Sequence, residues 1–344
     1  MSFVNVRAIP SPEEIRENTP CTPDIAEIKK KNDKELADIF TGKSDKFIVI
    51  VGPCSADDEE AVCDYMNRLA EVNKQVKDKL FIVTRVYTNK PRTTGDGYKG
   101  MLHQPDPESE PNMLEGLYSI RHMYLRVIRE TGFPLADEML YPSNLPFVTD
   151  LLSYIAIGAR SVENQQHRLI SSAIDVPVGM KNPTSGDLSV MFNSIHAAQC
   201  PHDFLYNGYE IRTSGNPLAH AIMRGSVNKH GNSIPNYHYE DLTRAYSMYM
   251  DGGYANPAII VDANHANSQK KFYEQPRIVK EILNSRSCNA HIKQIVKGVM
   301  IESYIEEGNQ KVGCENHVYG KSITDACLGF EDTKELLFYM ADNL

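Results

Sequence analysis

The feature that most constrains the fold of this chain is a short pattern that recurs from residue 46 onward. Apolar runs rich in β-branched residues end abruptly in a polar or charged residue, which is typical of buried parallel strands. The eight runs are FIVIVGPCS, LFIVTRVY, FPLADEM, YIAIGARS, VPVGMKN, LAHAIMRG, AIIVDANHAN and VKGVMIES. Between several of them lie helical stretches with apolar residues about 3.6 positions apart; one of these, MLEGLYSIRHMYLRVIRETG, is expected to stop at Gly132.

This alternation predicts an α/β fold, a (β/α)8 TIM barrel, for which about 250 residues is typical. An open doubly wound sheet is the main alternative, but it usually has fewer parallel strands, and no G-x-G-x-x-G follows the first run. We expect the barrel to occupy residues 46–344. Residues 1–45 are expected to form an N-terminal extension with a helix near 24–40, serving as an oligomer or regulatory contact, or else a disordered tail. The stretch 206–220 is longer than a plain connection and is expected to hold an extra hairpin.

Composition narrows the class of protein. The net charge of −9 argues against general nucleic-acid binding, which depends on excess Lys and Arg facing phosphates. No run approaches the roughly 18 apolar residues of a membrane span, and no basic segment followed by an apolar one marks a signal peptide. The seven cysteines are scattered without a C-x-x-C, a pattern that suits reduced thiols. We therefore expect a soluble cytoplasmic protein with no nucleic-acid or membrane partner.

Polar side chains follow the apolar runs, at the strand ends where a barrel of this kind carries its functional residues. One group combines a thiol, an imidazole and two carboxylates, which together can bind a divalent transition metal: Cys54, His265, Glu302 and Asp325. The four are far apart in the sequence and form no compact ligand motif, so the alternative for Cys54 is a small core residue.

A second group is cationic, with one acidic counterpart: Arg85, Lys90, Arg92, Arg160, Lys181 and Arg224, with Glu138. Arginine presents forked donors that match carboxylate and phosphate oxygens. Gathered at one barrel mouth, these cations would repel one another unless anions neutralised them, which predicts an anion-rich substrate. The alternative is that several of them pair with surface carboxylates.

Nine segments, in order, resemble the type I 3-deoxy-D-arabino-heptulosonate 7-phosphate (DAHP) synthases over about residues 46–335. They are GPCSADD, RVYTNKPRTTGDGYKG, AIGARSVENQQHR, VGMKN, IMRG, DANHANS, GVMIES, EEGNQ and YGKSITDACLGFEDT. The resemblance implies a metal-dependent transferase with the barrel fold. Such an enzyme condenses phosphoenolpyruvate with erythrose 4-phosphate in the first step of the shikimate pathway, which leads to chorismate and the aromatic amino acids.

The resemblance also implies roles for individual residues. One divalent ion (Mn, Fe, Co or Zn) would be bound by Cys54, His265, Glu302 and Asp325. Phosphoenolpyruvate would be bound by Arg85, Glu138, Gly158, Ala159, Arg160, Lys181 and Arg224. Erythrose 4-phosphate would be bound by Lys90, Pro91, Arg92 and Thr93, together with Asp325. The expected catalytic residues are Lys90 as proton donor, Glu138 as the residue that holds water, and Cys54 and His265 through the metal.

Some segments depart from the family pattern. TTGDGYKG has one residue more than many relatives and lacks their tryptophan, and EMLYPSNLPF and SSAIDVPV differ where better-known relatives bind an inhibitor. The identity of an aromatic amino acid inhibitor, and its existence, therefore stay open. We expect a homo-oligomer, a dimer or a tetramer.

Two rival functions were weighed. A sister enzyme, 3-deoxy-D-manno-octulosonate 8-phosphate (KDO 8-phosphate) synthase, uses arabinose 5-phosphate, but its Lys-Ala-Asn-Arg-Ser-Ser loop differs from KPRTT here. A catalytically dead regulatory barrel is the other alternative, and it is disfavoured because every expected position is filled.

Overall fold

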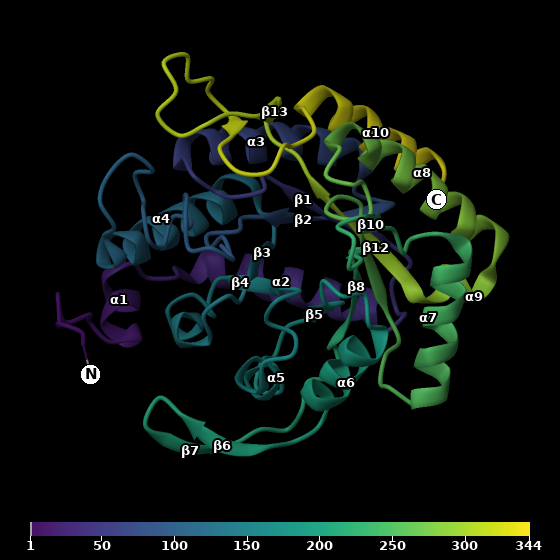
Figure 1. Cartoon of the computed structure of the whole chain (residues 1–344), viewed down its shortest axis with the longest axis horizontal. Helices are drawn as coiled ribbons and strands as arrows, with labels where there is room; N and C mark the ends of the chain where they lie inside the picture. The colour runs from purple at the N-terminus through teal and green to yellow at the C-terminus, as the bar shows by residue number, and fades with distance from the viewer. Residues whose placement is uncertain (1) are drawn as a thin grey trace.

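Eight parallel strands close into a barrel in the computed structural model, which describes residues 2–344 (Figure 1). In order around the barrel they are β1 (Phe47–Gly52), β2 (Leu80–Arg85), β3 (Leu135–Glu138), β4 (Leu152–Ile157), β5 (Val178–Lys181), β8 (His220–Met223), β11 (Ile259–Asp262) and β12 (Val296–Glu302). β12 pairs with β1 and closes the ring, with Ile50 opposite Met300. Each of the eight apolar runs forms one of these strands, so the predicted barrel is confirmed.

Helices surround the barrel on its outer face (Figure 1). They are α3 (Glu59–Val76), α4 (Met113–Thr131), α5 (Gln165–Ser171), α6 (Leu188–Gln199), α7 (Tyr239–Gly252), α8 (Gln275–Cys288), α9 (Ala290–Ile295) and α10 (Phe330–Asp342), with short 3₁₀ segments at η1 (Pro142–Phe147) and η2 (Phe272–Glu274). Helix α4 ends at Gly132 as predicted, because that residue adopts the left-handed conformation (φ 71°) that favours glycine. None of the helices in residues 2–344 is long and apolar enough to cross a membrane.

Three small two-stranded sheets lie outside the barrel. The predicted extra hairpin is present, formed by β6 (Asp203–Tyr206) and β7 (Tyr209–Arg212), so it begins three residues earlier than expected. Its turn is Asn207–Gly208, both with positive φ, the combination that tight hairpin turns require. The other two sheets pair β9 (Ser226–Val227) with β10 (Ser233–Ile234), and β13 (Glu306–Asn309) with β14 (Lys321–Ser322).

The N-terminal segment forms two helices, α1 (Pro12–Asn18) and α2 (Pro23–Phe40). Helix α2 coincides with the helix expected near 24–40. Its last turns join the buried cluster that fills the barrel interior, and the Phe40 ring lies 4.3 Å from the His220 ring. Helix α2 therefore covers the end of the barrel where the strands begin. That this extension makes an oligomer or regulatory contact stays a prediction.

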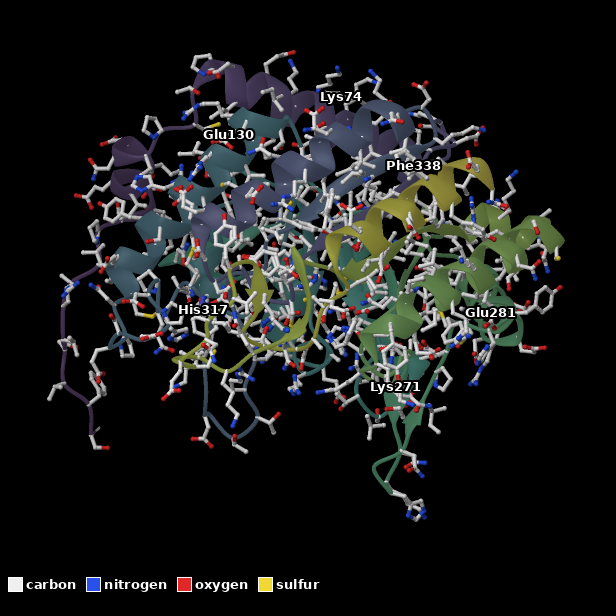
Figure 2. All side chains as sticks on the ribbon, turned by 90° about the horizontal axis from the view of Figure 1, so that it is seen from above. Lys74, Glu130, Lys271, Glu281, His317 and Phe338 are labelled. Carbon is white, nitrogen blue, oxygen red and sulfur yellow. The ribbon has the colours of Figure 1, made fainter. Side chains whose placement is uncertain are left out.

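The barrel wall lies between two buried apolar clusters, and the barrel has two distinct ends. One apolar cluster fills the space between strands and outer helices, and a smaller one lies inside the barrel beneath the strand ends. In Figure 2, the loops bearing Lys271 and His317 lie at one end, and Lys74 and Glu130, near the carboxyl ends of their helices, lie at the other. The carboxyl ends of the strands open toward the loop end, and the candidate site lies there.

Candidate active site at the carboxyl ends of the barrel strands

A cavity of about 160 Å³ lies at the carboxyl ends of the strands, and predicted residues form most of its wall. The predicted residues that line it are Cys54, Arg85, Lys90, Pro91, Arg92, Glu138, Gly158, Ala159, Arg160, Lys181, Arg224, His265 and Asp325. Two predicted residues do not line it. Glu302 is buried directly beside its wall, where it contacts Arg85, whereas Thr93 is exposed on the loop. The fold thus brings together residues that are distant in sequence.

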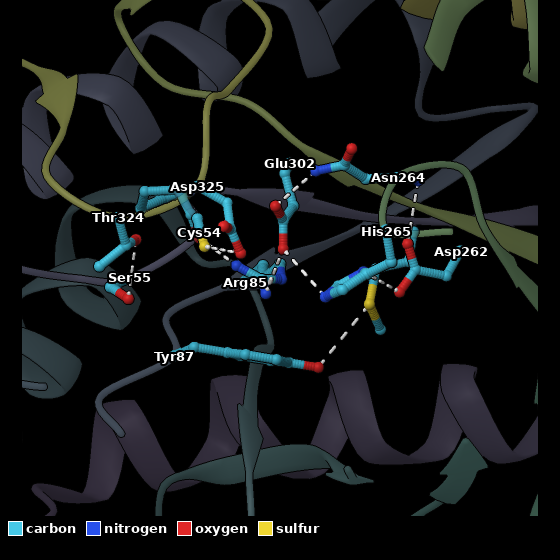
Figure 3. Close-up of polar contacts among 12 residues, drawn as sticks. Cys54, Ser55, Arg85, Tyr87, Asp262, Asn264, His265, Glu302, Thr324 and Asp325 are labelled. Carbon is cyan, nitrogen blue, oxygen red and sulfur yellow. Dashed lines mark hydrogen bonds and ion pairs between the residues drawn. The ribbon is translucent and has the colours of Figure 1, made fainter. Parts of the chain in front are cut away.

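Three of the four predicted metal donors form a tight group. One ligand atom each from Cys54, Glu302 and Asp325 lies within 4.8 Å of the others. His265 does not share that mutual range, but its Nε2 lies 3.8 Å from Glu302 Oε1 (Figure 3). A thiol, two carboxylates and a neighbouring imidazole form a donor set that suits a divalent transition metal. The residues present therefore fit such an ion.

Glu302 is the most firmly held of these donors. Its carboxylate accepts a hydrogen bond of 2.8 Å from Arg85 Nη2 and one of 2.6 Å from Asn264 Nδ2 (Figure 3). Its backbone exchanges two further hydrogen bonds with the Gln275 side chain. Although burial raises the pKa of Glu302, the charges of Arg85 and His265 hold it below its usual value. The carboxylate is therefore ionised and fixed before any ligand arrives.

His265 is oriented by a strained backbone and by Asp262. The residue has a φ of 50°, which is uncommon for residues other than glycine. Such a backbone conformation persists where the surrounding structure holds the residue in place. Its Nδ1 lies 2.8 Å from Asp262 Oδ2 at the end of β11. Burial raises the pKa of Asp262, but the neighbouring charges of His265, Lys181 and Arg224 outweigh this and lower it. Asp262 thus directs the other ring nitrogen toward Glu302.

The basic loop that follows β2 is closed on itself and anchored to β3. The backbone N–H of Lys90 donates to the Lys99 carbonyl at 2.9 Å, and Arg92 Nε donates to the Tyr98 carbonyl at 2.8 Å. At the base of the loop, Lys90 Nζ lies 2.8 Å from both Asp325 Oδ2 and Cys54 Sγ. The ammonium group is therefore placed at the edge of the donor group.

Asp137 on β3 holds the start of this loop. Its two carboxylate oxygens accept hydrogen bonds from the Thr88 backbone N–H, the Thr88 hydroxyl, the Tyr124 hydroxyl and the Glu138 N–H, at 2.6 to 3.1 Å. Burial raises the pKa of Asp137 to about 6, although these hydrogen bonds oppose the shift. The role of Asp137 could not be predicted from the sequence, because it depends on contacts from the loop after β2 and from helix α4.

The opposite side of the cavity carries cations around Glu138. Lys181 Nζ lies 3.8 Å from Glu138 Oε2 and 3.7 Å from Asp262 Oδ2. The absence of a side chain at Gly158 lets this carboxylate lie close to the backbone, because an added Cβ would be 2.4 Å from Glu138 Oε1. Burial lowers the pKa of Arg224, and the nearby charge of Arg160 adds to that effect while Asp262 opposes it. Like charges held close together favour an anionic ligand.

Five cavity residues were not predicted: Tyr87, Asn89, Ser161, Thr184 and Lys270. The Tyr87 ring lies 3.8 Å from the guanidinium carbon of Arg85, a cation–π contact that fixes the guanidinium plane. Tyr87 belongs to the quoted run LFIVTRVY, so its position two residues after Arg85 was an available signal. Lys270 Nζ lies 3.6 Å from Asp325 Oδ1, and nothing in the sequence pairs these two positions.

Known proteins resemble this chain in sequence and in fold. The sequence model of the DAHP synthetase I family matches residues 24–338. A Corynebacterium glutamicum protein named phospho-2-dehydro-3-deoxyheptonate aldolase is 35% identical over 97% of this chain and 91% of its own length. The Trp-sensitive phospho-2-dehydro-3-deoxyheptonate aldolase of Escherichia coli K12 is 36% identical over 98% of this chain and 95% of its own. The solved structure of the Francisella tularensis aldolase of the same name superposes with a TM-score of 0.91 at 31% identity, covering 99% of this chain and 98% of that one.

Proposed function

This chain belongs to the DAHP synthetase I family, and from that membership we propose how its own residues perform the family reaction. The protein condenses phosphoenolpyruvate with erythrose 4-phosphate and water to give DAHP and phosphate, which is the first step of the shikimate pathway. The observation that carries the proposal is the single cavity in which buried cations face a group of metal donors.

Phosphoenolpyruvate is bound by the cations on the β2, β4, β5 and β8 side of the cavity. Its carboxylate and phosphate oxygens accept hydrogen bonds from Arg85, Arg160, Lys181 and Arg224, whose forked or compact donors suit these groups. The backbone at Gly158–Ala159 and the Glu138 carboxylate complete this subsite. Within residues 2–344 the Arg224 side chain makes one hydrogen bond, of 3.5 Å to the Gly225 carbonyl, so its remaining donors are available to a ligand.

Erythrose 4-phosphate is bound by the closed loop that begins at Lys90. Pro91, Arg92 and Thr93 form its rim, and Arg92 directs its guanidinium toward the phosphate of the sugar. Thr93 is exposed, so its contribution is through its backbone or through a contact made only when substrate is present. Asp325, which already pairs with Lys90, lies beside the aldehyde end.

Cys54, His265, Glu302 and Asp325 would hold a divalent ion, which would supply Lewis-acid polarisation of the aldehyde carbonyl. Mn, Fe, Co and Zn all accept such a mixed donor set. Lys90 lies against two of these donors and is placed to give a proton to the oxygen that becomes an alkoxide.

The reaction joins carbon 3 of phosphoenolpyruvate to the aldehyde carbon of erythrose 4-phosphate. As that bond forms, positive charge develops at carbon 2 of phosphoenolpyruvate, and a water molecule held by Glu138 adds there. The carbon–oxygen bond to phosphate then breaks, so phosphate leaves with the bridging oxygen and carbon 2 becomes the ketone. Holding two polyanions in line is the main task of the site, and it is electrostatic and positional.

The test is a steady-state assay of phosphate release and product formation. We expect activity with erythrose 4-phosphate in clear preference to arabinose 5-phosphate, loss of activity with EDTA, and recovery with added Mn²⁺. Cys54→Ala should lose both metal binding, measured by equilibrium dialysis, and activity. Preference for arabinose 5-phosphate would refute the acceptor, and full activity of Cys54→Ala would remove that thiol from the donor set.

The rival functions weighed from the sequence are disfavoured. The curated relatives carry the heptonate aldolase name rather than that of an octulosonate enzyme. A catalytically inactive barrel would not require a cluster of buried cations that faces a group of metal donors. Complete inactivity of the metal-loaded protein with both sugars would favour the dead barrel.

We also propose control by an aromatic amino acid and assembly into a dimer or tetramer. The name of the E. coli relative states tryptophan sensitivity. Apolar side chains exposed at the N-terminal segment and on the β6–β7 hairpin could be covered by a second copy: Phe3, Val4, Val6, Leu205 and Tyr209. Light scattering reports the assembly, and activity titrations with tryptophan, phenylalanine and tyrosine report the inhibitor.

A further inference from the structure

A second cation-rich hollow lies at the opposite end of the barrel, where the strands begin. Its volume is about 1020 Å³, and it lies between the end of α2, the starts of β1, β2 and β12, and the α8–α9 connection. Five cationic side chains line it: Lys46, Lys79, Arg286, Lys293 and Lys297. Asp45, Asp78 and the last residue, Leu344, also line it, so positive side chains outnumber negative ones.

Arg286 is the centre of this hollow. It lies on the last turn of α8 and is only 9% exposed, and its guanidinium carbon lies 4.5 Å from the centre of the Phe47 ring. Its Nε is fully buried and has no hydrogen-bond partner among residues 2–344. No ion pair in the described chain involves Arg286 either. A guanidinium that stacks on an aromatic ring keeps the N–H donors along its edges free, and these donors bind oxygen atoms.

The other deeply buried arginines of residues 2–344 show how unusual this is. Arg121 is saturated by Asp150 and by oxygens of Thr19 and Phe147. Arg85 is held by Glu302 and the Pro53 carbonyl, although its Nε is also buried without a partner among residues 2–344. The Arg224 side chain makes a single long hydrogen bond within residues 2–344 and faces the active-site cavity. Arg286 therefore resembles Arg224, whose donors are open to a ligand, more than it resembles Arg85 and Arg121, which pair with carboxylates.

A half-buried lysine reinforces the positive charge. Burial lowers the pKa of Lys297, and the charge of Arg286 lowers it further, so the two cations repel each other; the charge of Asp45 opposes this shift without reversing it. Burial also lowers the pKa of Arg286 to about 10, so the guanidinium remains charged at neutral pH without a counter-charge. Burying a charge without a partner is costly, and an anion bound between these two groups would remove that cost.

We propose that this hollow is a second anion-binding site, built on Arg286 and Lys297, that takes a small molecule carrying a phosphoryl group. A guanidinium fork and nearby ammonium groups match phosphate oxygens in geometry and charge. Thr41, Ser44 and Gln294 in the same lining supply neutral donors for the rest of the ligand. The site lies across the barrel from the active-site cavity and shares no residue with it.

Equilibrium dialysis with labelled inorganic phosphate, repeated with pyrophosphate, tests the proposal by counting bound anions per chain. The wild-type protein should bind phosphate at the active site and at the Arg286 site, the latter with half-saturation at or below about 1 mM. Arg286→Gln should weaken the second class about tenfold or more, because it removes a charge-assisted contact. Arg224→Gln should weaken only the active-site class. Arg129→Gln, which removes an exposed arginine of α4, should change neither.

Each outcome decides the question. Unchanged phosphate stoichiometry in Arg286→Gln would overturn the proposal, as would half-saturation far above about 1 mM at that site. If Arg286→Gln does not fold, Lys297→Gln, at a half-buried position, should weaken the second class of bound phosphate in the same way. The steady-state rates of Arg286→Gln with both substrates should match those of the wild type, so this test is independent of the proposed roles of the active-site residues. Tungstate bound at Arg286 in a crystal would locate the site directly.

Discussion

The substitution Gly158→Ala tests whether the position of the Glu138 carboxylate determines the rate. The new Cβ would lie 2.4 Å from Glu138 Oε1, whereas ordinary contact begins near 3.4 Å. The backbone of Gly158 is not in the left-handed region, so alanine is tolerated there. The carboxylate is the movable end of a flexible side chain, and it must therefore shift by about 1 Å from its present position beside Gly158.

A displacement of about 1 Å in a catalytic site can cost roughly 100-fold in rate, or about 2.7 kcal/mol of activation free energy. We therefore expect kcat to fall by about that factor, with an unchanged unfolding midpoint. Steady-state kinetics with varied phosphoenolpyruvate and erythrose 4-phosphate, together with thermal unfolding, measure both quantities. Gly329→Ala is the matched control, because its new Cβ meets the nearest atom at an ordinary 3.5 Å.

A double-mutant cycle with Glu138→Asp sharpens this prediction. The shorter side chain withdraws the carboxylate from position 158, so Gly158→Ala should cost much less in the Glu138→Asp background than in the wild type. Additive losses, or a kcat of Gly158→Ala within twofold of the wild type, would refute the reasoning. A large fall in unfolding midpoint would show that the effect is on the fold instead.

Three further predictions concern the interior and the basic loop. Phe40→Ala should lower the free energy of unfolding by about 3–5 kcal/mol in urea titrations, because this 2%-exposed ring packs against His220 inside the barrel. Burial lowers the pKa of His220 to about 4, against about 6.5 unfolded, so stability should fall as the pH drops from 6.5 toward 4. That loss should reach about 2 kcal/mol at pH 5 in urea unfolding and be absent in His220→Gln. Asp137→Asn replaces an oxygen that accepts from the Thr88 and Tyr124 hydroxyls, so we expect a KM for erythrose 4-phosphate raised about tenfold, and an unchanged KM would contradict the loop-anchoring role.

Much of the fold could be predicted because its signals are local. Each barrel strand is a short run rich in β-branched residues, and the polar residue that follows the run marks where the strand ends. Gly132 ends its helix because glycine readily adopts the left-handed conformation. The 206–220 hairpin was predicted only approximately, since the turn at Asn207–Gly208 is clear but the pairing that sets its ends is not local. The covering of the barrel floor by α2 was not predicted, because apolar spacing shows which face is buried and not what it is buried against.

The candidate site divides in the same way. The residue types at the strand ends were available from the sequence, since a closed parallel barrel brings all those ends together. The distances were not available: Lys90 against Cys54, and Lys270 against Asp325, depend on loops whose course is set by packing. Thr93 lies in the predicted motif and is nevertheless exposed, while Tyr87 was not among the predicted site residues and lines the cavity.

By itself, the sequence determined the number and order of the eight barrel strands and the chemical types placed at their ends. These follow from side-chain periodicity and local backbone preference, which are properties of neighbouring residues. Only the tertiary structure decided which charges are paired. Arg121 and Arg286 are both arginines on amphipathic helices, yet one meets Asp150 and the other meets no acceptor among residues 2–344. Charge pairing depends on contacts between segments distant in the chain. A buried charge that finds a partner is stabilised, whereas one without a partner costs free energy.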